Sequence, residues 1–258
     1  MSRHTRRASA LALAVALAAA SRLSAQQAAA SANPNIDPAA MSALAKMGAY
    51  LRGLKSFHTE SENTRDDVLD DGQKIKRNGS ASLLVRGPDK LRAHVKGDLQ
   101  DRMYFYDGKT FTLYGQALGY YAQAAAPPTI PQLIDVLENK YDLDIPLADL
   151  FLWGTDKADA NMITSALDAG PSEVDGTACE HYVFRQTDVD WQVWIQQGAN
   201  PLPRKIVITS TDDDARPEYV STIKWDLAPA YNDEAFTFYP PKDAYKIVFA
   251  ADRPASGK

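Results

Sequence analysis

Hydrophobic and polar residues alternate along much of the chain with a period of two, which is the period of a β-strand with one buried face. The alternation is clearest in the segment KLRAHVK, where Leu91, Ala93 and Val95 are separated by charged or polar side chains. The turn pairs Gly87-Pro88 and Gly97-Asp98 bound this segment. Similar segments around it predict about six strands in an antiparallel meander with one buried and one solvated face.

Apolar residues recur every three or four positions before and after these strands, which indicates helices. Asp37 and Pro38 are typical of a helix start, and an apolar stripe follows them as far as Leu54. After the strands, Thr129 and Gln132 have the spacing of a capping box and precede an apolar helical insert. The segment DKADANMITSALDAG predicts one more helix. About five strands follow, of which the last is AFTFY.

The predicted order is therefore one helix, about six strands, a helical insert and about five further strands. This order favours an α+β domain. A single sheet of ten or more strands tends to curl. We therefore expect one large curved antiparallel half-barrel, with the N-terminal helix and the helical insert, a lid, on its concave apolar side.

The chain is expected to divide into four segments. Residues 1–25 begin with the basic stretch MSRHTRR and continue with an apolar run shorter than the roughly 20 residues of a membrane span, so they predict a cleaved secretory signal, cut after Ala25 or Ala32. We expect residues 26–36 to be a linker, residues 37–247 to form a single domain and residues 248–258 to be a flexible tail. No other segment is long and apolar enough to span a membrane, so the mature protein is expected to be soluble and exported.

The net charge and the cysteine content indicate which partners and which cellular compartment to expect. Removal of residues 1–25 takes away four arginines and no acidic residue, so the formal net charge moves from −5 to −9. An acidic protein lacks the positive footprint of a nucleic-acid-binding protein. The only cysteine, Cys179, has no partner for an intramolecular disulfide. Together with the alanine-rich signal, this favours a bacterial periplasm.

The segment ACEHYVFRQTDVDWQVWI holds the strongest candidate for chemistry. Strand alternation places Cys179 and His181 on one face, as a thiolate–imidazole pair requires. No third ligand stands at a recognisable spacing for zinc, and a single cysteine in an apolar strand is usually a small buried side chain. The other histidines stand singly, and no phosphate-binding loop or hydrolase motif is present. We therefore expect no catalytic residue, no metal and no cofactor.

The helical insert is more apolar than a water-exposed lid needs to be. Apolar helices over a curved sheet enclose either a filled core or a pocket for a lipid-like ligand. The candidate cavity residues are Leu133, Ile134, Leu137, Leu150, Phe151 and Trp153.

The first half of the sheet carries an excess of positive charge. Residues 74–102 contain eight lysines and arginines against three aspartates. The outer face of an antiparallel sheet is charged by default, but such a stripe also suits an anionic partner or a membrane surface. The candidate docking residues are Lys74, Lys76, Arg92 and Lys96.

Several blocks, among them GPDKLRAHVKGD, FYDGKTFTLYG, CEHYVFRQTDVDWQVWI and PLPRKIVIT, resemble a family of predicted bacterial periplasmic proteins that is a domain of unknown function. The resemblance runs through about residues 36–247. That family is similar to the superfamily of the lipoprotein carriers LolA and LolB and the lipid-sensing domain of RseB. The resemblance implies a LolA-like half-barrel whose concave side encloses a hydrophobic cavity.

The favoured hypothesis is a non-catalytic periplasmic protein that binds or carries a lipid-like or lipoprotein acyl ligand. The alternative is an envelope sensor that docks to a partner protein through the basic stripe. An enzyme that uses Cys179 and His181 is the third hypothesis.

Overall fold

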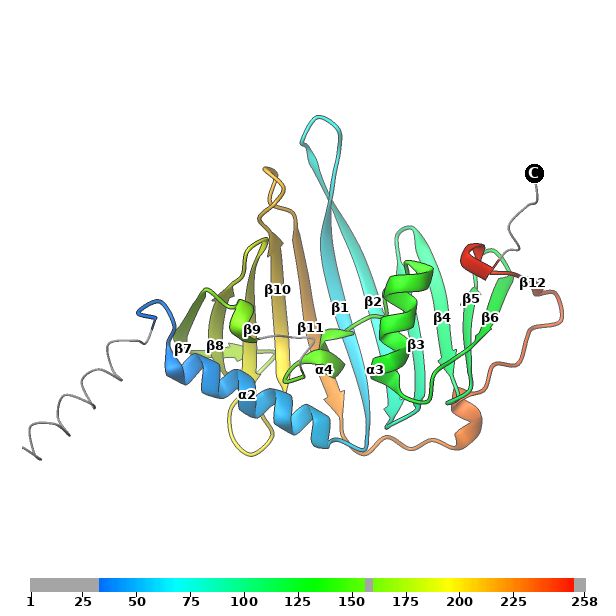
Figure 1. Cartoon of the computed structure of the whole chain (residues 1–258), viewed down its shortest axis with the longest axis horizontal. Coiled ribbons are helices and arrows are strands. Elements are labelled where there is room, and N and C mark those ends of the chain that lie inside the picture. Colours follow the sequence, from blue (N-terminus) through cyan, green and yellow to red (C-terminus); the bar gives the residue numbers. More distant parts are fainter. Residues whose placement is uncertain (1–32, 156–159, 253–258) are drawn as a thin grey trace, which may run out of the picture.

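The computed structural model describes residues 33–155 and 160–252 (Figure 1). In this part of the chain, twelve strands form one sheet in the order β12-β6-β5-β4-β3-β2-β1-β11-β10-β9-β8-β7. All neighbouring strands are antiparallel except β12 and β6. The sheet is curved and open, since its edge strands β12 and β7 do not pair with each other. The expected large, curved, antiparallel sheet with helices on one side is thus confirmed.

The sheet consists of two meanders that meet at its centre. The first contains β1 (Ser56–Val68), β2 (Lys74–Arg86), β3 (Lys90–Gly97), β4 (Gln100–Tyr106), β5 (Thr110–Gly115) and β6 (Tyr120–Ala125). The second contains β7 (Ser165–Val174), β8 (Thr177–Arg185), β9 (Val189–Gln196), β10 (Pro203–Ser210) and β11 (Glu218–Asp226). The short strand β12 (Tyr245–Ile247) adds to the outer edge of β6. Strand β11 returns to β1, where Ile223 lies opposite Ser61, and so joins the two meanders.

Helix α2 (Pro38–Gly53) covers the part of the sheet that contains β7–β11 (Figure 1). It begins as the sequence predicts, because the Asp37 side chain accepts a hydrogen bond from the backbone N–H of Ala39 at 2.7 Å and Pro38 occupies the first turn. Its apolar stripe, which includes Leu44 and Met47, is buried against the sheet. Burial of this stripe, rather than helix propensity, holds the helix in place.

The lid, residues 130–153, covers the middle of the sheet, from β3 to β11 (Figure 1). It contains α3 (Ile130–Val136), a π-helical turn (Leu137–Tyr141) and α4 (Asp149–Leu152). Phe57 of β1 lies between Phe151 of the lid and Trp225 of β11, with ring-centroid distances of 6.2 and 5.2 Å. The lid is therefore joined to the sheet by a packed core.

Two predicted elements are wrong. The helix expected in DKADANMITSALDAG is replaced by a 3-10 turn (Ala160–Met162) and the edge strand β7; residues 156–159 lie outside the described part of the chain. Alternation is poor in β7 because its register shifts between Asp168 and Gly170, where the Asp168 side chain accepts a hydrogen bond from the Gly170 N–H at 2.8 Å. The strand expected in AFTFY, residues 235–239, is absent: its first two residues end a 3-10 turn (Asp233–Phe236) in which Phe236 is buried, and the other three belong to no helix or strand.

The domain ends later than residue 247. Phe249 packs 4.6 Å from the ring of Tyr141 and 6.2 Å from that of Phe111. The Asp252 carboxylate accepts hydrogen bonds from Lys140 at 2.6 Å and from the Tyr141 hydroxyl at 2.8 Å. The first residues of the expected tail are therefore part of the domain, because they cover the π-helical turn.

The expected signal peptide, residues 1–25, lies outside the described residues, as does most of the expected linker. Ile36, near the end of the linker, forms a β-bridge with Ala166. None of the described helices has the length and apolar character needed to cross a membrane.

Candidate ligand-binding cavity

A cavity of about 530 Å³ lies between the lid and the concave face of the sheet. Its sheet wall comes mainly from β1–β4, with contributions from β10 and β11. Its lid wall comes from the segment between the π-helical turn and the end of α4. This volume falls within the range of about 300–1,000 Å³ that is usual for small-molecule sites.

Part of the cavity wall is apolar. Strand alternation directs alternate residues of each strand to the concave side, and the lid contributes the loop between its helices. The apolar lining residues are Ala81, Val95, Ile206 and Ile208 from the sheet and Leu143, Ile145, Leu147 and Leu152 from the lid. Leu147 adopts φ 58°, a left-handed conformation that is rare for a branched side chain. Such strained residues often occur where a protein binds a ligand.

The sheet side of the cavity is cationic. Arg65 and Arg77 both bind the Asp67 carboxylate, at 3.2 and 3.0 Å. Arg102 is exposed and takes part in none of the ion pairs of the described residues. All three arginines line the cavity. One full positive charge on Arg102 therefore faces the space under the lid.

The lid side of the cavity is acidic. Its four acidic lining residues, none of which belongs to an ion pair of the described residues, are Glu138, Asp142, Asp144 and Asp149. The Asp149 side chain is solvent-accessible on the cavity, yet it is surrounded by protein. Desolvation by these surroundings, with the nearby Glu138 charge as a smaller contribution, raises the pKa of Asp149.

Two tyrosines of the sheet, Tyr104 and Tyr219, lie close to charges of the cavity wall. Burial raises the pKa of Tyr104, while the adjacent Arg102 opposes the shift and the Asp144 charge adds to it. Burial likewise raises the pKa of Tyr219; a hydrogen bond with Ser221 opposes the shift, and the Asp149 charge adds to it. Arg102 and Asp144 therefore lie near one phenol, and Asp149 lies near the other.

Ser221 of β11 is fully buried behind the cavity wall. It lies opposite Asn63 and Ile206, which line the cavity, and its hydroxyl is a hydrogen-bond partner of Tyr219 on the same strand.

The six lid residues predicted from the sequence lie next to the cavity rather than on its surface. Leu133, Ile134 and Leu137 are 1% exposed and pack in the core. Leu150 is also buried, Phe151 contacts Phe57 and Trp153 stacks on Trp191 at 6.3 Å. These residues hold the lid on the sheet.

The lid residues that line the cavity were missed because they lie between the two short helices. The segment DLDIPLAD, residues 142–149, alternates acidic with apolar residues. This alternation was the signal in the sequence, since a purely structural lid loop has no need of it.

The four predicted docking residues lie on the convex face of the sheet, as their strand positions require. Lys74 and Lys76 bind the Asp66 carboxylate at 3.4 and 2.7 Å, and the pKa of Asp66 is lowered, chiefly by the hydrogen bond from Lys76. Arg92 lies over the Phe105 ring at 5.5 Å. Lys96 lies at the rim of the cavity. The stripe is therefore less positive than the sequence count suggests.

A second hollow, of about 340 Å³, lies on the convex face. Lys96, Lys224 and His94 line it together with Glu60 and Glu62. The mixture of both signs with several serines makes it a polar groove without an apolar floor.

Cys179 and His181 lie on one face of β8, as predicted, and this is the convex face of the sheet, but each side chain is bound to other groups. Cys179 is fully buried, its thiol donates to the Thr177 carbonyl at 3.4 Å, and burial raises its pKa. His181 Nε2 lies 2.9 Å from Gln192 Oε1, and its ring stacks on Trp194 at 3.9 Å. A thiol with a raised pKa is a poor nucleophile at neutral pH. Nowhere in residues 33–155 and 160–252 do three metal-ligating side chains come together.

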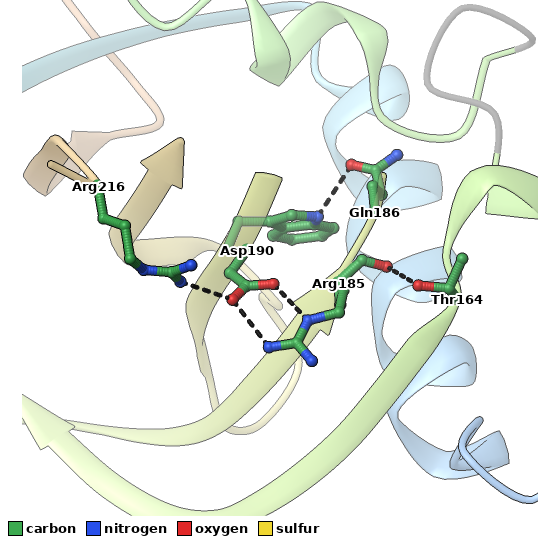
Figure 2. Close-up of polar contacts among 6 residues, drawn as sticks. Thr164, Arg185, Gln186, Asp190 and Arg216 are labelled. Carbon is green, nitrogen blue, oxygen red and sulfur yellow. Dashed lines mark hydrogen bonds and ion pairs between the residues drawn. The ribbon is translucent and has the colours of Figure 1, made fainter. Parts of the chain in front are cut away.

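Asp190, in the same sequence block, is the centre of a charged cluster (Figure 2). Its carboxylate accepts two hydrogen bonds from Arg185, at 2.7 and 2.9 Å, and one from Arg216 at 3.1 Å. These bonds, led by that of Arg185, lower the pKa of Asp190. The neighbouring Trp191 indole donates to Gln186 at 3.2 Å. We call Arg185, Asp190 and Arg216 the Asp190 cluster; it joins β8, β9 and the loop before β11.

A protein-family model described as "Predicted periplasmic protein (DUF2092)" matches residues 40–250. No curated protein sequence matches the chain. Among solved structures, an uncharacterized conserved protein from Thermus thermophilus aligns with a TM-score of 0.46 at 10% identity, over 81% of this chain and 99% of that chain. LprF from Mycobacterium bovis aligns with a TM-score of 0.45 at 14% identity, over 82% and 100% of the two chains. A LolA superfamily protein from Nitrosomonas europaea aligns with a TM-score of 0.32 at 11% identity, over 77% and 97%.

Proposed function

The chain belongs to the family described as "Predicted periplasmic protein (DUF2092)", as the sequence blocks predicted, and from this premise we propose that it is a periplasmic carrier for a lipid-like ligand. The observation that supports the proposal is the cavity of about 530 Å³ with an apolar floor. The apolar part of the wall favours a ligand that covers it and removes it from water.

The hydrophobic effect supplies the affinity of such a carrier. Each methylene group removed from water contributes about 0.8 kcal/mol. Ile206 and Ile208 of the sheet and Leu147 and Leu152 of the lid all line the cavity, so an acyl chain in this space can contact apolar side chains of both walls. The core contacts of the lid keep the cavity preformed, which lowers the entropic cost of binding.

The proposed role includes no chemical conversion of the ligand. Cys179 lies on the convex face, opposite to the cavity, and is fully buried with a raised pKa. His181 on the same face is held by Gln192 and Trp194. Neither side chain reaches a molecule held under the lid.

The partner-docking hypothesis has less support. Asp66 binds two of the four lysines and arginines of the stripe. One carboxylate thus compensates part of the charge of the stripe, and the proposed role is that of a carrier.

A titration of the delipidated mature protein with a fluorescent fatty acid tests the proposal. Ile208→Trp fills the cavity and is expected to weaken binding at least tenfold, because the larger ring occupies the space of the acyl chain. Ile247→Trp, on the exposed outer strand β12, is the matched control and is expected to bind as the wild type does. Equal binding by both variants, or no uptake by the wild type, contradicts the proposal.

A further inference from the structure

The two walls of the cavity carry opposite charges that do not neutralise each other. Arg102 on the sheet belongs to none of the ion pairs of the described residues, and neither do Asp144 and Asp149 on the lid. Charges that serve only to hold a lid closed are expected to be in contact. Here both signs instead face a space of about 530 Å³.

The cation and the carboxylates lie around the same part of the cavity. The pKa of Tyr104 is affected by both the Arg102 guanidinium and the Asp144 carboxylate, so both groups lie near its phenol. The Tyr219 hydroxyl donates a hydrogen bond to Asn63 at 3.1 Å. The Asp149 carboxylate contributes to the raised pKa of Tyr219, so it lies near this second phenol. These tyrosines stand on β4 and β11, on either side of the strands β1–β3, and both line the cavity.

The charge pattern disfavours three simpler ligands. An anionic head group at Arg102 alone meets the uncompensated carboxylates of the lid. A cationic head group at Asp149 alone leaves the Arg102 guanidinium of the sheet wall without an anionic partner. An uncharged lipid leaves both sets of charges desolvated beneath it without a partner, which is costly.

We propose that the cavity binds a zwitterionic amphiphile, a lipid whose head group carries a phosphate and an ammonium group. The phosphate faces Arg102 on the sheet, the ammonium group faces Asp144 and Asp149 on the lid, and the acyl chain covers the apolar floor. This assignment rests on the proposed carrier function and names the class of ligand.

The test compares three mono-acyl lipids with the same chain: lysophosphatidylethanolamine, lysophosphatidylglycerol and monoacylglycerol. They carry a zwitterionic, an anionic and an uncharged head group. Binding to the delipidated mature protein is measured by native mass spectrometry or calorimetry. We expect the zwitterionic lipid to bind at least tenfold more tightly than either of the others, because each charge-assisted hydrogen bond contributes about a factor of ten.

Two variants test which side of the cavity binds each charge of the head group, and a third variant is the control. Arg102→Gln is expected to weaken lysophosphatidylethanolamine about tenfold and to leave monoacylglycerol unchanged. Asp149→Asn is expected to weaken lysophosphatidylethanolamine and to strengthen lysophosphatidylglycerol, since it removes a carboxylate that repels the anion. Arg92→Gln, on the convex face over Phe105, is the matched control and keeps the wild-type order. A thermal melt of each variant confirms that it is folded.

The outcomes separate this inference from the carrier function. Equal affinity for all three lipids overturns the zwitterionic head group but keeps the carrier. Tighter binding of the anionic lipid by the wild type also overturns the inference. If none of the three lipids binds, the carrier function itself fails.

Discussion

The Asp190 cluster and the cavity treat charge in opposite ways. In the cluster, one carboxylate is bound by two guanidinium groups, and the adjacent indole has its own acceptor (Figure 2). In the cavity, Arg102 and the lid carboxylates face one another without an ion pair among the described residues. Polar groups that hold the fold are satisfied within the chain, whereas those left unpaired at a cavity are available to a ligand. The first region therefore explains the fold, and the second indicates the function.

The lid also contains both residues that hold the fold and residues that line the cavity. Truncation of a residue of the first kind is expected to cause the largest loss of stability. Leu133→Ala removes a side chain that is 1% exposed in the core, and the expected loss is about 2–5 kcal/mol of the free energy of unfolding. Leu152→Ala changes a half-buried residue of the cavity wall and is expected to cost less than about 1.5 kcal/mol. Urea denaturation of both variants measures the two losses.

For ligand binding the order is expected to be the opposite: Leu152→Ala weakens binding more than Leu133→Ala does. Folded Leu133→Ala retains its cavity wall, while Leu152→Ala loses apolar contact with the acyl chain. Similar losses of stability in the two variants would remove the distinction between residues that attach the lid and residues that line the cavity.

The Asp190 cluster predicts a smaller effect on stability. Asp190→Asn removes the charge that Arg185 and Arg216 share, and the expected cost is about 1–2 kcal/mol, reduced by the exposure of both arginines. Because the folded pKa of Asp190 is lowered, this stability is present above the unfolded pKa of about 3.9. It is lost as the pH falls through the folded pKa.

Thermal melts of wild type and Asp190→Asn between neutral and acidic pH measure this effect. Asp188→Asn, two residues away in the same turn and in no ion pair of the described residues, serves as the control with little expected change. A gap between wild type and Asp190→Asn that stays constant down to the most acidic condition would count against a structural role of the carboxylate.

Substitution of Asp149 is expected to have the smallest effect on the free energy of unfolding, and this effect is a gain rather than a loss. The folded pKa of Asp149 is raised, chiefly by desolvation, so the ionised form destabilises the folded protein at neutral pH. Asp149→Asn is therefore expected to increase stability by less than about 1 kcal/mol. The gain disappears as the pH falls below the unfolded pKa of about 3.9, because both states of the wild type are then protonated. Loss of stability in the ligand-free Asn variant at neutral pH would show that Asp149 is satisfied within the fold.

Much of the fold could be predicted because local patterns and tertiary burial agree. In β3, Leu91, Ala93 and Val95 alternate with polar residues, and the odd-numbered side chains do face the core. The start of α2 at Asp37 follows from capping. The edge strand β7 was mistaken for a helix, since an edge strand with a register shift at Gly170 need not alternate.

The cavity was harder to predict because apolar residues that fill a core and apolar residues that line a cavity look alike in a sequence. Leu133 and Leu152 differ only in what lies opposite them in the folded chain. The charged residues carry a clearer signal. Arg102 occupies the same strand face as the buried Tyr104 and Tyr106, and a cation at an inward-facing position marks a place where the core is open.

Native mass spectrometry of the protein, purified from its source cells without detergent, shows directly whether the cavity carries a lipid. We expect a retained adduct whose mass corresponds to a phospholipid with a phosphate and an amine, and we expect its loss in Ile208→Trp. A protein that carries no adduct, and takes up none of the three mono-acyl lipids when they are added, would contradict the carrier function.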